Sequence, residues 1–349
     1  MTSQFLLNVD HGSDTDLGGV AQDISDAVDG ADLQAVSVEP FVQHAAEPGG
    51  RYVMCPPKYL STRIPNNVWM SQEKVDIEKA LRQYSRLKNI IEALEITVLE
   101  IPPTKGCQDQ TYVANVGVAI EPYIILANYK APGRDCEVEP ARAFFEQQGY
   151  QCVQPPFHFE GEADLKKYTD EIYFGGWGLF TDPRALKWIA DLTGRTIVPI
   201  HEINKEVYHL DCSLLVVDET NLLVAAEGID AQSLKTLKSM AKVTLTPPEI
   251  LTTGITNAAL VRRKQLVLSG TFNPEMPDYQ KAMKWMNCTF DDFGYTVVFL
   301  DVDEFDKSGA DLSCCIFHLD FEATPQSLPV GQTGKQQIQT PIPQYARSA

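Results

Sequence analysis

The order of the predicted elements constrains the fold most, because one small unit recurs along the chain. Pairs of strand-like runs rich in Val, Ile, Leu and Tyr alternate with amphipathic helices, and the set returns roughly every 50–60 residues. In the clearest helix, 72–94, apolar residues recur at intervals of three and four, with charged residues between them. This repetition predicts an array of similar hairpin-plus-helix units packed as one α/β domain.

The individual elements follow from periodicity, prolines and helix caps. We expect helices at 72–94, 139–148, 182–193, 231–240 and 277–288. We expect strands at 51–55, 96–103, 112–120, 123–129, 151–157, 171–174, 196–200, 207–217, 222–226, 243–246, 258–262, 265–269, 296–300 and 312–319.

The two ends of the chain differ from the repeating part in composition. Residues 1–49 contain nine Asp or Glu and neither Lys nor Arg, without a sustained apolar period. After Glu322 the chain is dominated by Pro, Gln, Ser and Gly. We therefore expect a flexible acidic extension at 1–49, a folded domain at 50–322 and a disordered tail at 323–349. The extension is either a solvating tail or a segment that binds a partner or inhibits the protein itself.

Charge and composition argue against several classes of protein. The net charge of −18 argues against nucleic acid or an acidic membrane surface as partner, and no apolar run approaches the length that spans a bilayer. The eight Cys show neither metal-ligand spacing nor the rhythm of a disulfide scaffold, and the opening MTSQFLLNVDHG lacks the features of a signal peptide. We expect a cytoplasmic, reduced protein without a metal or an organic cofactor.

The stretch 205–217, KEVYHLDCSLLVV, places an imidazole close to a carboxylate. It has the composition of a strand, in which His209 and Asp211 would point to the same face. Such a pair suits a site that moves protons while it holds a cation. The alternative is a His and an Asp at a strand edge that face water.

Further short motifs accompany this pair in a fixed order. They are MCPP at 54–57, NVWM at 67–70, DQTYVAN at 109–115, FEGEAD at 159–164 and KSGADLSCC at 307–315. With His209 and Asp211, their order and spacing resemble the pentein superfamily, which includes arginine deiminases, dimethylarginine dimethylaminohydrolases, amidinotransferases and arginine dihydrolases. The resemblance covers about residues 51–321. It implies a five-fold pseudo-symmetric α/β propeller with the site in its central channel.

The resemblance also implies three catalytic residues. Cys314 aligns with the nucleophile, and a thiol becomes one when an imidazole and acidic groups lie nearby; otherwise it is a packing residue. Cys315 would point to the opposite strand face and pack in the core. By resemblance, Glu160 orients and charges His209, as carboxylates do in other imidazole-based sites; otherwise it is a loop carboxylate.

Six residues are candidates for holding the substrate. Asp211 would accept hydrogen bonds from a guanidinium, whose planar donors match a carboxylate. Asn115 stands where deiminases carry a second Asp, and in the family this Asn goes with dihydrolases; its alternative is a turn Asn. The remaining candidates are three residues on the rim, Asn67, Asp109 and Gln110, together with Asp164, which would bind the substrate's amino group.

One position departs from the family pattern. The stretch GWGLFT at 176–181 has Phe180 where the pattern carries an Arg that binds the substrate's α-carboxylate. Either Arg184 takes its place or the substrate lacks that carboxylate.

These motifs indicate a hydrolase that cleaves guanidino C–N bonds of arginine or an arginine-like compound through a Cys thiouronium intermediate, with release of ammonia. One alternative is an amidinotransferase that passes the amidino group to an amine; another is a binding protein on the same scaffold. The expected partner is a guanidino small molecule, and the sequence leaves open the exact substrate and whether the chain forms a homo-oligomer.

Overall fold

The computed structural model describes residues 50–71, 73–273 and 275–320. The predicted acidic extension and C-terminal tail lie outside the described residues. Among the described residues, no helix is long and apolar enough to cross a membrane.

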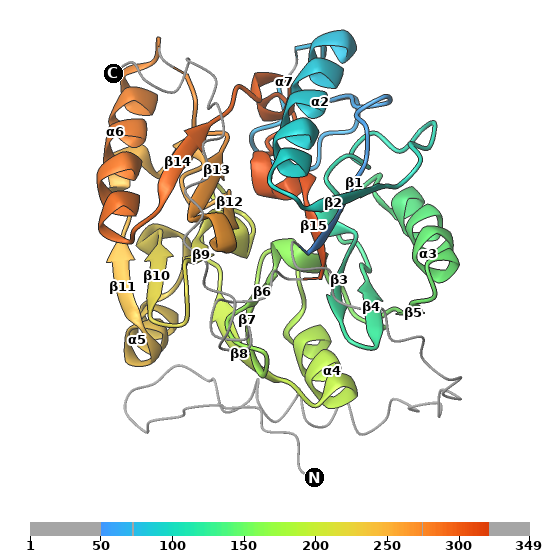
Figure 1. The fold of residues 1–349 in the computed structure, drawn as a ribbon. Coiled ribbons are helices and arrows are strands. Elements are labelled where there is room, and N and C mark those ends of the chain that lie inside the picture. Colours follow the sequence, from blue (N-terminus) through green and yellow to red (C-terminus); the bar gives the residue numbers. More distant parts are fainter. Residues whose placement is uncertain (1–49, 72, 274, 321–349) are drawn as a thin grey trace, which may run out of the picture.

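Five three-stranded sheets surround a central axis, each with one helix on its outer side (Figure 1). In every sheet the middle strand pairs antiparallel with one neighbour and parallel with the other. The prediction of repeated hairpin-plus-helix units is therefore confirmed. The sheets are β15 (Phe317–Asp320)–β1 (Arg51–Met54)–β2 (Thr97–Glu100), β3 (Gly117–Ile120)–β4 (Tyr123–Leu126)–β5 (Gln151–Val153), β6 (Leu165–Lys167)–β7 (Ile172–Trp177)–β8 (Thr196–His201), β9 (Leu214–Val216)–β10 (Asn221–Val224)–β11 (Lys242–Leu245), and β12 (Ala258–Val261)–β13 (Leu266–Ser269)–β14 (Thr296–Phe299).

One long helix joins the parallel pair of each sheet, because parallel strands need a crossover connection. In chain order these helices are α2 (Ile77–Ala93), α3 (Val138–Gln147), α4 (Pro183–Thr193), α5 (Ala231–Met240) and α6 (Pro277–Asp292), and a short α7 (Asp303–Asp306) follows β14. Helix α4 begins as predicted, with the Asp182 carboxylate accepting a bond from Arg184 N. Helix α2 begins later than predicted, because Asp76 caps it by accepting from Lys79 N.

The first and last described strands lie in one sheet and close the ring. Strand β1 pairs antiparallel with β15, and the Arg51 side chain bonds to Asp320 and to the Tyr150 hydroxyl. Packing joins neighbouring units as well, since Phe145 of α3 lies 5.0 Å from Phe317 of β15 between ring centroids. Burying one such ring contributes about 1.5–3 kcal/mol.

Short 3-10 turns precede the first strand of four units. They are η1 (Val113–Asn115), η3 (Gly161–Ala163), η4 (Leu210–Cys212) and η8 (Leu312–Cys315). Turn η1 lies against η3 and η8, and η3 lies against η4. The strands predicted at 112–120, 207–217 and 312–319 therefore began too early. Apolar side chains enter the core from these turns, and in a short apolar run periodicity cannot tell such a turn from a strand.

Candidate active site

A cavity lies where these turns meet. Six of the nine residues predicted for the site line it, namely Asn67, Asp109, Asn115, Glu160, His209 and Cys314. Gln110, Asp164 and Asp211 are not on its wall. The other lining residues, which the sequence did not single out as ligands, are Asn66, Tyr112, Ala131, Arg134, Phe180, Tyr208, Ser308 and Ala310.

Cys314 lies in η8 and is 5% exposed. Its Sγ is 3.4 Å from Asn257 Nδ2 and 3.8 Å from Asp211 Oδ2. Burial and the nearby Asp211 carboxylate raise the pKa of the thiol to about 12. The adjacent Cys315 is buried away from the cavity, with its Sγ 3.9 Å from the Asp311 carbonyl. Of the two thiols, only that of Cys314 faces the cavity.

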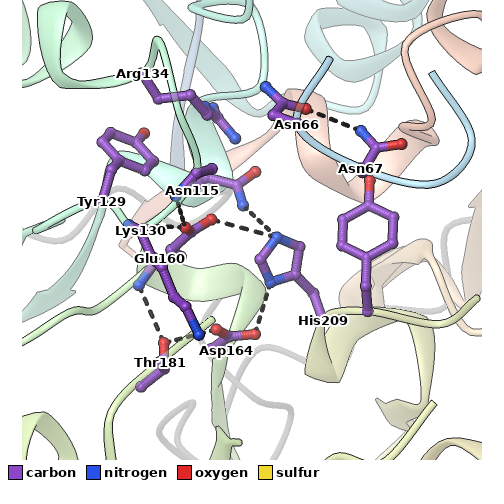
Figure 2. Close-up of polar contacts among 12 residues, drawn as sticks. Asn66, Asn67, Asn115, Tyr129, Lys130, Arg134, Glu160, Asp164, Thr181 and His209 are labelled. Carbon is purple, nitrogen blue, oxygen red and sulfur yellow. Dashed lines mark hydrogen bonds and ion pairs between the residues drawn. The ribbon is translucent and has the colours of Figure 1, made fainter. Parts of the chain in front are cut away.

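His209 lies between two carboxylates (Figure 2). Its Nδ1 is 2.9 Å from Asp164 Oδ1, and its Nε2 is 3.4 Å from Glu160 Oε2. Burial disfavours the charged ring, but the two carboxylates prevail and raise the pKa of His209 to about 9. Asn115 Nδ2 is 3.2 Å from the same Nε2, so an amide also faces the reactive side of the ring. A protonated imidazole therefore faces the cavity at neutral pH.

Glu160 presents one carboxylate oxygen to the cavity and holds the other in place. Its Oε1 accepts bonds from the backbone N–H groups of Lys130 (3.2 Å) and Ala131 (3.0 Å) (Figure 2). Gly161 makes this turn feasible, because its φ is +67° and a Cβ there would lie 2.4 Å from the Ala114 carbonyl oxygen. Complete burial raises the pKa of Glu160, an effect that the cationic His209 opposes.

Asp164 lies beside the His209 imidazole. Its Oδ1 accepts from His209 Nδ1 and Leu210 N, and its Oδ2 accepts from Thr181 Oγ1 at 2.6 Å. Both oxygens are thus bonded inside the protein, and the predicted contact of Asp164 with a substrate amino group stays a prediction. The short, Gly- and Ala-containing turn between Glu160 and Asp164 lets their carboxylates reach opposite sides of one ring.

Asp211 and Asn257 hold the loop that carries the thiol. Asp211 Oδ2 accepts from Ser313 Oγ at 3.1 Å, and Asn257 Oδ1 accepts from Ser313 N at 2.9 Å. His209 and Asp211 are therefore close in space, although they belong to a turn and not to one strand face as predicted. Asn257 was missed, but repeat symmetry could have found it: it immediately precedes β12, just as Asn115 lies shortly before β3.

Of the three residues predicted on the rim, Asn67 and Asp109 line the cavity and Gln110 does not. Asn67 Nδ2 bonds to the Ser308 carbonyl, and Asp109 Oδ2 accepts from Asn66 Nδ2 at 2.7 Å, which leaves Asp109 Oδ1 without a partner among the described residues. Gln110 points elsewhere: its amide bonds to Thr104 N and the Pro102 carbonyl. Gln110 therefore does not line the cavity, because the adjacent loop uses both ends of its amide.

Arg184 does not replace the missing arginine. It pairs with Asp182 at 2.6 Å and lies over the Phe157 ring, away from the cavity. Phe180 lies on the cavity wall instead, with its ring centroid 4.9 Å from that of His209.

The basic side chain on the wall besides His209 is Arg134. Its Nε and Nη2 are each 2.9 Å from the Glu137 carboxylate, and Nη2 also donates to the Tyr112 carbonyl. Cys107 and Cys136 form a disulfide beside it, with Cα atoms 5.7 Å apart. The expectation of free thiols throughout is therefore corrected for this pair.

Comparison with known proteins supports the resemblance. No family model matches the chain. It is 25% identical over 270 residues to the N(G),N(G)-dimethylarginine dimethylaminohydrolase of Mycobacterium tuberculosis, covering 77% of this chain and 85% of the relative. It is 27% identical over 188 residues to ArgZ of Synechocystis, a bifunctional arginine dihydrolase/ornithine cyclodeaminase, but these residues cover only 26% of ArgZ.

Solved structures show the same fold. The N-terminal domain of ArgZ, bound to product, matches with a TM-score of 0.71 at 21% identity, covering 78% of this chain and 97% of that domain. The dimethylarginine dimethylaminohydrolase of Pseudomonas aeruginosa, bound to citrulline, matches with a TM-score of 0.63 at 17% identity, covering 77% and 98%.

Five similar units around one axis, with a Cys, a His and a Glu meeting at their inner turns, define an enzyme of the guanidino-modifying type. In sequence and in fold the chain is similar to proteins of the pentein superfamily. Within that superfamily, the relatives to which it is similar are dimethylarginine dimethylaminohydrolases and arginine dihydrolases.

Proposed function

We propose that the protein hydrolyses guanidino C–N bonds of arginine or an arginine-like compound through covalent attachment to Cys314. One observation carries the proposal: the Cys314 thiol, the His209 imidazole and the Glu160 carboxylate face one small buried cavity. A cationic guanidinium fits there because Glu160 and the unpartnered Asp109 oxygen are acceptors on its wall.

The substrate itself activates the nucleophile. In the free site the raised pKa keeps Cys314 as a thiol at neutral pH. A guanidinium bound beside Sγ supplies the positive charge that favours the thiolate, and the thiol proton leaves to water. The thiolate then attacks the guanidino carbon and forms a neutral tetrahedral adduct.

His209 supplies the proton for the leaving group. It is protonated at neutral pH, so it can transfer its Nε2 proton to the departing amino nitrogen as that C–N bond breaks. Ammonia leaves, and a cationic thiouronium remains on Cys314. The neutral imidazole next takes a proton from water, the hydroxide adds to the thiouronium carbon, and the C–S bond breaks to give a ureido product and the free thiol.

Asp164 and Glu160 have separate tasks in this scheme. Asp164 fixes the ring orientation through Nδ1 and stabilises its charge, which is the task of the carboxylate in other imidazole-based sites. Glu160 faces the cavity and accepts from a guanidinium N–H or from the incoming water. This division differs from the sequence-based assignment, in which Glu160 alone oriented the imidazole.

The finer proposal is a dihydrolase that acts twice. Asn115 is on the wall beside His209, where an amide supports a neutral ureido group as well as a cation. The ureido product can then stay, react again with Cys314 and lose a second ammonia. Hydrolysis of the resulting S-carbamoyl group gives a carbamate, which releases the amine and carbon dioxide.

The proposal leaves unspecified the part of the substrate that lies beyond its guanidino group. Phe180 provides an apolar surface where the family pattern has a carboxylate-binding Arg. Arg134 lies elsewhere on the wall with two of its nitrogens already bonded to Glu137. We therefore include guanidino compounds with and without an α-carboxylate among the candidates.

A panel of such compounds, read by ammonia release and mass spectrometry, tests the function. We expect ammonia release with at least one member and a covalent Cys314 adduct when the reaction is quenched. Turnover only when an amine acceptor is added, with the amidino group on that amine, would show an amidinotransferase. Binding without turnover of any member would show a binding protein.

A further inference from the structure

Glu202 is a buried carboxyl group that the proposed mechanism does not use. It follows directly after β8 and is 1% exposed, and neither oxygen has a hydrogen-bond partner among the described residues. The ion pairs found among these residues do not include it. Burying a carboxyl group without a hydrogen-bond partner costs free energy, and the cost is largest when the group is charged.

The side chain of Glu202 packs beside two residues that hydrogen-bond to Asp164. It fits between Gly176 of β7 and Leu210, since a Cβ on Gly176 would be 2.8 Å from both Glu202 Oε2 and Leu210 Cβ. Gly176 N donates to the Asp164 carbonyl at 2.7 Å, and Leu210 N donates to Asp164 Oδ1 at 3.2 Å. Both residues that flank Glu202 thus hold Asp164, and residue 176 must be small to leave room for the carboxyl group.

The charges around Glu202 are mostly of its own sign. Burial and the negative charges of Asp164, Asp211 and Glu160 raise its pKa well above the usual value. The cation of this cluster is His209, which is already shared between Asp164 and Glu160. On the outer side, His201 pairs with Asp230. The surroundings therefore accommodate Glu202 as a neutral acid.

We propose that Glu202 is a positioning residue that supports Asp164 and His209 only as a neutral acid, and that its ionisation at alkaline pH limits the reaction. A fourth negative charge behind Asp164 would hold the proton on His209 more tightly. His209 would then be a weaker acid and would no longer give its Nε2 proton readily to the leaving amino group. This inference rests on the proposed function for its kinetic consequence, but not for the charge state of Glu202.

The test compares Glu202→Gln with Glu206→Gln, which changes an exposed carboxylate on the same segment. Gln has the shape of the neutral acid and cannot ionise. At neutral pH we expect kcat of Glu202→Gln within about twofold of the wild type. As the pH rises above neutral, the wild type and Glu206→Gln should lose activity first, while Glu202→Gln should keep its activity until His209 itself loses its proton near pH 9.

Two readouts do not require turnover. Infrared difference spectra between wild type and Glu202→Gln should show the loss of a protonated carboxylic acid at neutral pH. The rate of Cys314 alkylation by iodoacetamide should rise at a lower pH in Glu202→Gln than in the wild type, because ionised Glu202 opposes the thiolate.

Several outcomes would overturn the inference. They are a tenfold or larger loss of kcat in Glu202→Gln at neutral pH, pH profiles that coincide, a Gln variant that does not fold, or an ionised Glu202 in the infrared spectra. If no guanidino compound is turned over, the proposed function fails, while the infrared and alkylation results still decide the charge state of Glu202.

Discussion

His209 Nδ1 lies 2.9 Å from Asp164 Oδ1, and both Asp164 oxygens are taken up by bonds inside the protein. The opposite nitrogen, Nε2, faces Glu160 and the cavity at 3.4 Å. One imidazole thus has a carboxylate that only positions it and another that is exposed to whatever fills the cavity. Because the two carboxylates act on different nitrogens, their substitutions should have different kinetic effects.

Replacing the thiol should separate Cys314 from its neighbour. Cys314→Ser should lose at least a thousandfold in kcat, because it removes the covalent pathway. Cys315→Ser should change kcat little, since Cys315 lies in the core off the cavity wall. Steady-state ammonia release measures both, and mass spectrometry should find no adduct on Cys314→Ser. An inactive Cys315→Ser that remains folded would show that the nucleophile is assigned wrongly.

Removing the charge behind the imidazole should lower the pKa of His209. Asp164→Asn takes away the largest favourable influence on the protonated ring, so the pKa should fall from about 9 towards the ordinary value. The proposed general acid is then lost at neutral pH, which should reduce kcat about a hundredfold or more. NMR titration of His209 measures the pKa directly. Asp230→Asn, next to the more exposed His201, is the control.

The raised pKa of His209 also links stability to pH. The folded pKa of about 9 exceeds the ordinary 6.5. The resulting stabilisation is fully present below pH 6.5 and is lost as pH rises through 9. It should amount to a few kcal/mol. Chemical denaturation of wild type and His209→Phe at several pH values checks this, and the wild type should lose stability over that interval more than the variant.

Asn257 should tune the thiol. Its Nδ2 donates to Cys314 Sγ at 3.4 Å and lowers the thiol pKa, against burial and the Asp211 charge. Asn257→Asp replaces a donor with a charge, so the pKa of Cys314 should rise by about one unit and alkylation near neutral pH should slow about tenfold. Asn287→Asp, at an exposed position of α6, is a control with the same charge change. Faster alkylation of Asn257→Asp would contradict the assigned role of the amide.

Asn115 should decide how many ammonia molecules leave. We expect more than one per substrate in the wild type, because the amide can hold the neutral ureido product for a second attack. Asn115→Asp should bind the cation at least as well through a charge-assisted bond, yet stop at the ureido species. Ammonia stoichiometry with mass spectrometry of the ureido species distinguishes the two. One ammonia per substrate in the wild type would rule out the dihydrolase and leave a deiminase or dimethylaminohydrolase.

The sequence alone determined the repeating unit and the identity of the central side chains. Hydrophobic periodicity and proline positions are local properties, so the five helices and most strands could be predicted. The order of the short motifs identified Cys314, His209 and Glu160 as the candidate catalytic residues. The prediction of a domain at 50–322 flanked by two flexible ends stays a prediction.

The tertiary structure decided which of these side chains share a cavity and which nitrogen each carboxylate reaches. Asp164, Gln110 and Glu202 each carry a polar group, and their spacing could not tell a ligand from a group engaged in the interior. That distinction depends on contacts between units 40 or more residues apart, such as Leu210 with Asp164 or Asn257 with Cys314. These contacts join units that are distant in the sequence, so no local pattern encodes them.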